Sequence, residues 1–235
     1  MIDRIIVALD LKDRKRIEEL VDKLTMISFF KIGSVPFTLF GPELVAYLKG
    51  KNKRVFLDLK FHDIPSTVAG ACEAAVRLGV DMVNLHTLGG FEMMERALEA
   101  VLIASKNLNR PKPILLGVTI LTSIDEASFN DLFGPMEYSL HEKIISLARL
   151  AQSAGLDGVV SSVDRVAPIK AACGKDFIVV TPGVRPKGFE VGDHAKVFTP
   201  KEAFAVGSDY IVIGRPITRA DNPIRVVDQI IKELE

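Results

Sequence analysis

Cysteine is scarce in this sequence, with only Cys72 and Cys173 among its 235 residues. The two lie far apart in the chain and lack the spacing of metal ligands. A framework of disulfides, as in small secreted proteins, is therefore excluded, and both thiols are expected to be buried. Because chains without such a framework are typical of reducing compartments, we expect a cytoplasmic protein.

An excess of charge of one sign is also missing, because 30 basic residues are balanced by 30 acidic residues. Proteins that bind nucleic acid through its phosphates usually carry a basic excess, so that class of partner is disfavoured. A small anionic substrate is compatible with the balance, since it needs only a local cationic pocket. No apolar run is long enough for a membrane span, and the apolar stretch near the N-terminus is too short for a signal peptide.

Linkers and shifts in composition are absent as well, so residues 1–235 are expected to form a single domain. The sequence does contain a regular alternation of short apolar runs and helical patterns. Most of the runs are continuous in Val, Ile, Leu and Phe, which is typical of parallel strands buried on both faces. We expect these strands at residues 5–10, 29–34, 54–60, 82–87, 114–120, 158–162, 177–183 and 210–215.

Helical patterns fill the segments between these runs. Residues 13–24 place apolar side chains along one face, and a further helix is expected at residues 66–78. The last helix is expected to begin at Asn222-Pro223, a capping residue followed by proline at the first helical position. Eight alternating units predict an α/β protein with the closed (β/α)8 TIM barrel fold. An open, doubly wound sheet is the alternative, although no G-x-G-x-x-G follows the first strand as a dinucleotide site would require.

Charged and polar residues gather at the carboxyl ends of the expected strands, where barrels of this kind place their active sites. Two aspartates and two lysines around the mouth of an apolar barrel are costly unless they pair. His86, at the fourth of these ends, is expected to make a hydrogen bond at the barrel mouth. In chain order, the residues at the strand ends are Asp10, Lys31, Asp58, Lys60, His86, Thr122, residues 182–185, Gly214 and Arg215.

The most specific of these ends is the sequence D-L-K-F-H-D-I-P at residues 58–65. Side chains alternate along a strand, so Asp58 and Lys60 are expected on the same face. Lys31, on the neighbouring strand, is expected to reach Asp58 from the side, and Asp63 follows in the loop. An array of two carboxylates and two ammonium groups would keep every member charged.

The octapeptide resembles the signature of the orotidine 5'-monophosphate decarboxylase family. Further matches to the family follow in the same order and at the same barrel positions, so the resemblance covers essentially the whole chain. They are V-A-L-D at 7–10, F-K-I-G at 30–33, N-L-H at 84–86, L-T-S at 121–123, T-P-G-V-R at 181–185 and I-G-R-P-I-T at 213–218.

The resemblance implies a decarboxylase that needs neither a metal nor a cofactor. It would convert orotidine 5'-monophosphate to uridine 5'-monophosphate and carbon dioxide, the last step of de novo UMP biosynthesis. Lys60 would protonate C6 of the pyrimidine, and Asp58 would face the departing carboxylate. Lys31 would position Asp58 and touch the ribose. Asp63 would complete the network from the partner subunit of a homodimer, with Thr67 beside it at the ribose.

The resemblance also implies residues that bind the rest of the substrate. Asp10 would bind a ribose hydroxyl, and Thr122 would hydrogen-bond the pyrimidine. Gly214 and Arg215 would bind the phosphate at the end of the eighth strand, where barrels often do so. An arginine suits this role because its planar fork makes paired hydrogen bonds to a phosphate dianion.

Residues 182–197 are rich in glycine and charge and are predicted to form a lid over the phosphate. Arg185 would reach in from this lid, and Pro182 belongs to the same set of substrate-binding residues. His194 stands where many family members have a glutamine that contacts the phosphate. This substitution is the main departure from the family pattern.

Two other functions fit part of the same pattern. A magnesium-dependent decarboxylase or aldolase of 3-keto sugar phosphates shares the barrel and the D-x-K-x-x-D spacing, but Lys31 stands where it needs an acidic metal ligand. A non-catalytic phosphate-binding barrel would need only Arg185, Gly214 and Arg215. No pair of histidines has the spacing of zinc ligands.

Overall fold

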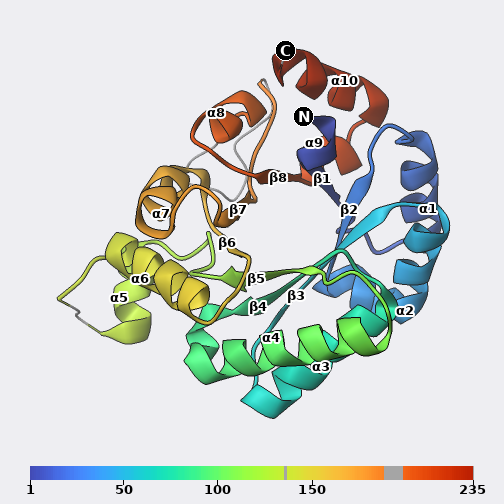
Figure 1. Cartoon of the computed structure of the whole chain (residues 1–235). Coiled ribbons are helices and arrows are strands. Elements are labelled where there is room, and N and C mark those ends of the chain that lie inside the picture. The colour runs from blue at the N-terminus through green and yellow to red at the C-terminus, as the bar shows by residue number, and fades with distance from the viewer. Residues whose placement is uncertain (135–136, 188–197, 235) are drawn as a thin grey trace.

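Eight parallel strands close into a barrel in the computed structural model, which describes residues 1–134, 137–187 and 198–234 (Figure 1). Each strand pairs with the next, and β1 also pairs with β8, which closes the ring. The predicted (β/α)8 TIM barrel is therefore confirmed. The strands are β1 (Ile5–Ala8), β2 (Phe29–Gly33), β3 (Arg54–Phe61), β4 (Met82–His86), β5 (Ile114–Val118), β6 (Gly158–Val160), β7 (Ile178–Thr181) and β8 (Tyr210–Ile213).

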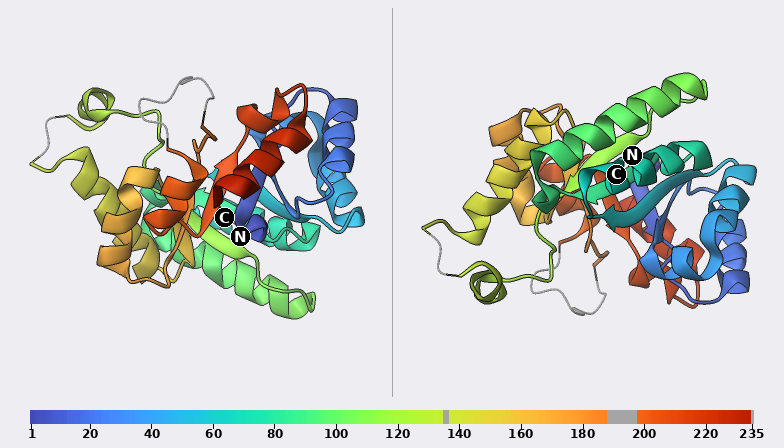
Figure 2. Two further views of the ribbon diagram at one scale, coloured as in Figure 1. Left: turned by 90° about the horizontal axis from the view of Figure 1, so that it is seen from above. Right: turned by 90° about the horizontal axis from the view of Figure 1, so that it is seen from below.

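Helices form an outer ring around the strands (Figure 1). Both α5 and α6 lie between β5 and β6 in the chain, and α5 stands away from the barrel body (Figure 2). In the part of the chain that the structure describes, no helix is long and apolar enough to cross a membrane. The helices are α1 (Arg14–Lys23), α2 (Ser34–Gly50), α3 (Pro65–Leu78), α4 (Gly90–Asn107), α5 (Glu126–Phe133), α6 (Leu140–Ser153), α7 (Val166–Cys173), α8 (Pro200–Ala205), α9 (Arg215–Thr218) and α10 (Pro223–Leu234), with short 3-10 turns at Ile2–Arg4, Thr87–Gly89 and Val163–Arg165.

The expected element boundaries differ from the observed ones mainly at the carboxyl ends of strands. Except at β3, each predicted strand runs one or two residues beyond its observed end, because the polar residues there already bend into loops or helices. Ser34, expected in the second strand, is the first residue of α2. The predicted start of the last helix is confirmed, since Oδ1 of Asn222 accepts a hydrogen bond from the N–H of Arg225.

Apolar side chains fill both the barrel interior and the space between the barrel and the helices. Because both faces of each strand are buried, the strand sequences are continuously apolar and do not alternate between apolar and polar residues. Because the interior is packed, the polar chemistry is confined to the barrel ends. The interior layer consists of Ile6, Ala8, Phe29, Phe56, Met82, Leu116, Val180 and Val212.

The amino ends of three strands carry the same anchoring arrangement. An aspartate precedes each of β4, β6 and β8, and its carboxylate accepts a hydrogen bond of 2.7 or 2.8 Å from a backbone N–H of the preceding strand. A lysine pairs with each carboxylate. Two residues before each aspartate, a glycine with positive φ ends the preceding helical segment. The repeated Gly-x-Asp triplets lie at residues 79–81, 155–157 and 207–209, and their aspartates pair with Lys49, Lys112 and Lys170, respectively.

Candidate active site

Four charged side chains form a continuous row at the carboxyl end of the barrel. Nζ of Lys31, on β2, lies 3.0 Å from Oδ2 of Asp58 and 3.0 Å from Oδ1 of Asp10. Oδ1 of Asp58, on β3, lies 2.7 Å from Nζ of Lys60. The predicted approach of Lys31 to Asp58 is confirmed, and Asp10 extends the row on the other side of Lys31.

Burial distinguishes the inner members of the row from the outer ones. The side chains of Lys31 and Asp58 are 9% and 10% exposed, against 35% for Lys60 and 54% for Asp10. Burial favours a higher pKa for Asp58, but Lys31, Lys60 and a hydrogen bond from Asn84 outweigh it and hold the pKa below its ordinary 3.8. Burial likewise opposes the charge of Lys31, yet Asp58 and Asp10 raise its pKa above 10.5. Both groups are therefore charged at neutral pH.

β3 is irregular where it presents Lys60. Residue 57 pairs with residue 83 of β4, but residue 61 pairs with residue 85, so a longer stretch of β3 lies opposite a shorter stretch of β4. Lys60 has a φ of 51°, in the left-handed region that costs an L-residue about 1 kcal/mol. A β-bulge therefore brings the side chains of Asp58 and Lys60 together. The sequence prediction assumed instead that side chains alternate regularly along an undistorted strand.

Asn84 of β4 also belongs to this site, although the sequence motifs assign it no role. Its side chain is fully buried. Oδ1 of Asn84 accepts a hydrogen bond of 2.8 Å from the N–H of Lys60, and Nδ2 donates one of 2.7 Å to Oδ1 of Asp58. The sequence does contain one indication of this role, a single asparagine within an apolar strand. A buried carboxamide needs hydrogen-bond partners, so a polar contact could be expected there.

Asp63 and Thr67 lie apart from the row, in the connection from β3 to α3 and in the first turn of α3. Both are exposed. Oδ1 of Asp63 accepts a hydrogen bond of 2.7 Å from the N–H of Ile64, and within the described ranges Asp63 forms no ion pair with Lys31 or Lys60. In a single chain the fourth charged member of the row is therefore Asp10, and Asp63 lies outside the row.

Two imidazoles lie beside the row. The ring centroids of His62 and His86 are 5.3 Å apart. Nδ1 of His86 is buried and has no hydrogen-bond partner among the described residues, so this atom does not make the expected bond. Burial lowers the pKa of His86 to about 4, with further lowering by His62 and Lys60 and an opposing effect of Asp58. His86 is therefore neutral at pH 7.

Thr122 and Pro182 line one cavity of about 490 Å³ beside the barrel mouth. This volume is within the range of small-molecule sites. Its walls come from the segments that follow β5, β6 and β7 and combine apolar with polar side chains, among them Ile120, Ser123, Ile144, Ser162, Asp164, Arg165 and Phe198.

The predicted phosphate-binding residues lie at the ends of β7 and β8. Gly214 follows β8 directly, and the exposed Arg215 begins α9. Arg185 is only 7% exposed, and its backbone N–H donates a hydrogen bond of 2.9 Å to the carbonyl of Phe198. This bond joins the two ends of the predicted lid. Residues 188–197, which include His194, lie outside the described residues.

Comparison with known proteins confirms the family resemblance over nearly the whole chain. The model of the Orotidine 5'-phosphate decarboxylase / HUMPS family matches residues 3–230. The orotidine 5'-phosphate decarboxylase of Moorella thermoacetica is 48% identical over 99% of this chain and 92% of its own, and that of Legionella pneumophila is 46% identical over 100% of both. The crystal structure of orotidine 5'-phosphate decarboxylase from Lactobacillus acidophilus is 35% identical and matches 99% of both chains with a TM-score of 0.86. With its row of alternating charges at the barrel mouth, buried at the centre, this chain belongs to the orotidine 5'-phosphate decarboxylase / HUMPS family.

Proposed function

We propose that this protein decarboxylates orotidine 5'-monophosphate to uridine 5'-monophosphate and carbon dioxide, the last step of de novo UMP biosynthesis. The observation that carries the proposal is the charged row at the barrel mouth, in which the buried Asp58 carboxylate lies between the ammonium groups of Lys31 and Lys60. Cleavage of the bond from C6 to the carboxylate leaves an electron pair on C6. Such a centre needs a nearby cation and a proton donor, and one lysine supplies both.

Lys60 is the proposed proton donor. Its ammonium group lies 2.7 Å from Asp58 and is 35% exposed, so it is held in place and still open to the barrel mouth. As carbon dioxide leaves, C6 takes a proton from Nζ, and Lys60 becomes a neutral amine. Asp58 would face the substrate carboxylate, and the repulsion between the two would fall as that charge departs. The reaction proposed here needs no metal and no cofactor.

The other candidate residues are proposed to hold the rest of the nucleotide. Lys31 and Asp10 are paired at the mouth, where a ribose hydroxyl can reach both. The cavity lined by the segments that follow β5, β6 and β7 has room for a pyrimidine ring, and the arginines near the ends of β7 and β8 suit a phosphate dianion. The proposed contacts are ribose to Asp10, Lys31 and Thr67, pyrimidine to Thr122 and Pro182, and phosphate to Arg185, His194, Gly214 and Arg215.

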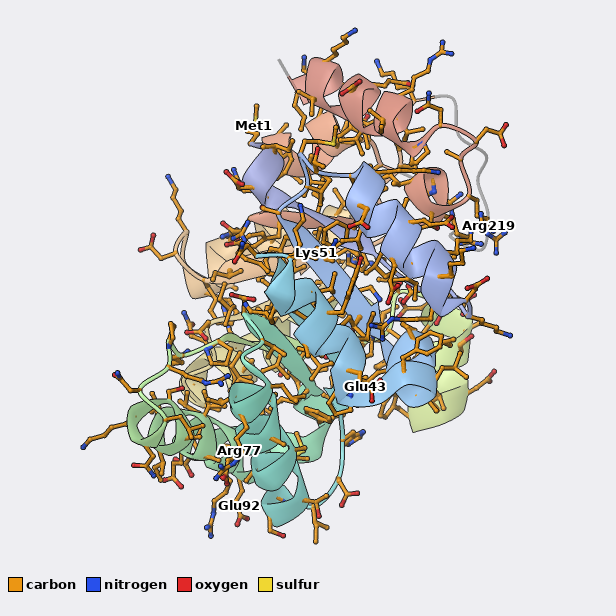
Figure 3. The ribbon with its side chains drawn as sticks, turned by 90° about the vertical axis from the view of Figure 1, so that its right-hand side faces the viewer. Met1, Glu43, Lys51, Arg77, Glu92 and Arg219 are labelled. Carbon is orange, nitrogen blue, oxygen red and sulfur yellow. The ribbon has the colours of Figure 1, made fainter. Side chains whose placement is uncertain are left out.

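We also propose a homodimer in which Asp63 and Thr67 of one subunit enter the active site of the other. Both residues are exposed, and the adjacent Ile64 is 64% exposed, which is costly for a large apolar side chain. Phe91 of α4 is 41% exposed, and a groove of about 560 Å³ lies between α3 and α4. Figure 3 shows this side of the molecule, with Glu92 of α4 labelled at its lower edge. A second copy seated here would cover the apolar side chains and bring Asp63 to a neighbouring site.

A cytoplasmic location is part of the proposal. Cys72 and Cys173 are buried and unpaired, and burial raises the pKa of the Cys72 thiol to about 12. Thiols of this kind are unreactive and suit a reducing compartment.

The magnesium-dependent alternative is less well supported by the surroundings of Asp58. Its Oδ1 accepts hydrogen bonds from Lys60 and Asn84, and its Oδ2 pairs with Lys31, so both oxygens already have cationic or N–H partners. An ammonium group at Lys31 repels a divalent cation. Across residues 1–134, 137–187 and 198–234, no three His, Cys, Asp or Glu side chains gather in a group that could hold a metal ion.

A non-catalytic phosphate-binding barrel is the second alternative. It would need only Arg185, Gly214 and Arg215 at the ends of β7 and β8. Such a protein would have no use for a buried carboxylate between two ammonium groups, because desolvating these charges is costly without a function that needs them.

The deciding experiment incubates the purified protein with orotidine 5'-monophosphate and follows the loss of orotate absorbance with and without excess EDTA. Turnover that is insensitive to EDTA is expected. Lys60→Ala should reduce turnover by roughly 10²- to 10⁴-fold or more, while UMP binding stays measurable by calorimetry. Lys51→Ala is the matched control, since the ammonium group of Lys51 is exposed and contacts Asp22 and the ring of Tyr47, away from the charged row. Absent turnover, or turnover lost with EDTA, would refute the proposed reaction.

A further inference from the structure

Asn84 lies in the middle of β4 with none of its surface exposed. Both ends of its carboxamide are used, because Oδ1 accepts from the backbone N–H of Lys60 and Nδ2 donates to the carboxylate of Asp58. The orientation of the carboxamide is forced, since an ionised carboxylate only accepts hydrogen bonds and a backbone N–H only donates them. One side chain thus connects the backbone of one charged residue to the carboxylate of another.

The hydrogen bond from the Lys60 N–H to Asn84 is important because it lies at the bulge in β3. In a regular parallel ladder, a strand N–H donates to a backbone carbonyl of the neighbouring strand. Where β3 is irregular, the N–H of Lys60 donates instead to the side chain of Asn84. This bond holds Lys60 at its left-handed φ of 51°, and that conformation sets the direction in which its side chain leaves the strand.

The second bond matters at the moment of proton transfer. Asp58 has Lys31 on one oxygen and both Lys60 and Asn84 on the other. When Lys60 gives its proton to C6, its positive charge beside Asp58 disappears. The Asn84 N–H stays in place, so together with Lys31 it keeps the Asp58 carboxylate ionised and in the same orientation.

We infer that Asn84 is a positioning residue for the decarboxylation, which acts through Lys60 and Asp58 and does not touch the substrate. The inference rests on the proposed function, because Lys60 is the proton donor only in that reaction. A residue of this kind controls the chemical step more than the binding of nucleotide. Its loss is therefore expected to lower kcat and to leave KM and the affinity for UMP nearly unchanged.

Two variants separate the two bonds. Asn84→Leu has a similar volume and removes both, and kcat is expected to fall by about 10- to 100-fold while KM and the Kd of UMP change by less than about three-fold. Asn84→Asp keeps an acceptor for the Lys60 N–H but places a second carboxyl beside Asp58. Its kcat is expected to be low at about pH 8 and to rise toward about pH 6, because two adjacent carboxyls share a proton that restores the missing donor. The wild type lacks a second carboxyl at this position and should not show this rise.

Thr87→Val is the matched control. Thr87 is fully buried in the 3-10 turn that directly follows β4, and its hydroxyl donates to the carbonyl of Val118, away from the charged row. This variant is expected to lose stability in urea and to keep the wild-type kcat and pH profile. Any kcat loss in Asn84→Leu that Thr87→Val shares would mark a general effect of disturbing β4 and would overturn the inference.

The outcomes distinguish this inference from the proposed function. If the wild type does not turn over orotidine 5'-monophosphate, the proposed function fails and the positioning role fails with it. If the wild type is active and both Asn84 variants keep kcat within about three-fold, only the positioning role fails. If Asn84→Leu does not fold, the pH profile of the nearly isosteric Asn84→Asp decides, and a profile parallel to that of the wild type overturns the inference.

Discussion

Gly33 leaves the space in which Lys31 and Asp10 meet. A Cβ atom added to Gly33 would lie 2.5 Å from Oδ1 of Asp10 and 2.9 Å from Nζ of Lys31, closer than atoms in contact can approach. The backbone of Gly33, with a φ of −89°, is open to any L-residue. The absence of a side chain at this position therefore serves the ion pair and not the backbone.

Gly33→Ala is expected to fold normally and to displace the carboxylate of Asp10, which is exposed enough to move. If Asp10 binds the ribose, KM for orotidine 5'-monophosphate should rise by about 3- to 30-fold, with a smaller effect on kcat. Steady-state kinetics and thermal melting test this expectation. Gly50→Ala is the control, because a Cβ there would meet no atom within 4 Å. Equal KM values for the two variants would contradict the expected role of the space.

His86 should make stability depend on pH in a defined window. Burial lowers the pKa of His86 from 6.5 to about 4 in the folded protein. Between these values the unfolded chain binds a proton that the folded chain does not, so the contribution of His86 to the free energy of unfolding falls as the pH falls. Asp58 affects the free energy of unfolding below this pH window. Because its pKa is lowered in the folded protein, its stabilising contribution is present above pH 3.8 and is lost at more acidic pH.

The expected result for His86→Gln is a shallower dependence of stability on pH between 6.5 and about 4 than in the wild type. Urea unfolding at several pH values within this window measures both slopes. Parallel curves for the two proteins would mean that burial does not shift the titration of His86.

The charged residues of the row were predictable because each stands at the end of an apolar strand and the carboxyl ends of parallel strands meet. The contact of Lys31 with Asp58 follows from this rule alone. The ion pair between Lys31 and Asp10 does not, because it depends on the space at Gly33. The two bonds of Asn84 could not be predicted either, since they depend on how far β3 departs from regular pairing.

The bulge in β3 is also the main difference between the predicted and the observed elements. Hydrophobic runs locate strands well because the barrel buries both faces of every strand. They carry no information about a local irregularity such as this one, where the side chain of Asn84 on the neighbouring strand accepts the hydrogen bond of the Lys60 N–H. The Gly-x-Asp repeat, in contrast, is visible in the sequence at residues 79–81, 155–157 and 207–209, and its anchoring role follows once the strands are known.

Asp157 connects the amino ends of β5 and β6, and this connection should contribute measurably to the free energy of unfolding. Asp157 accepts a hydrogen bond of 2.7 Å from the N–H of Leu115 and also pairs with Lys112. Asp157→Ala leaves that N–H without its acceptor and is expected to lower the free energy of unfolding by about 1–3 kcal/mol. Asp157→Asn keeps an acceptor and should lose less. Denaturant unfolding ranks the variants, and equal stabilities would contradict the proposed importance of the bond.

The two ends of the barrel therefore have different tasks. At the amino ends, aspartate and lysine pairs fix the register of successive strands, and the side chains of their aspartates are 30 to 32% exposed. At the carboxyl ends, the same two residue types form a row whose centre is almost fully buried. Variants at the amino ends should change stability without changing kcat, because the packed interior separates the two regions.

In the proposed homodimer each active site needs both subunits, because Asp63 of one subunit lies in the site of the other. Asp63→Ala and Lys60→Ala should each be nearly inactive alone. In a mixed dimer, however, one of the two sites has both residues intact. Statistical exchange of subunits in a two-fold dimer should therefore restore about a quarter of the wild-type activity.

A mixture of Asp58→Ala and Lys60→Ala is the matched control for this experiment. Oδ1 of Asp58 and Nζ of Lys60 lie 2.7 Å apart in the same chain. No mixed dimer of these two variants therefore contains an intact site, and no activity should return. Native mass spectrometry of isotopically labelled subunits verifies that exchange has taken place. If mixed dimers of Asp63→Ala and Lys60→Ala form and activity stays low, Asp63 does not act across the interface, and its exposed position in the single chain needs another explanation.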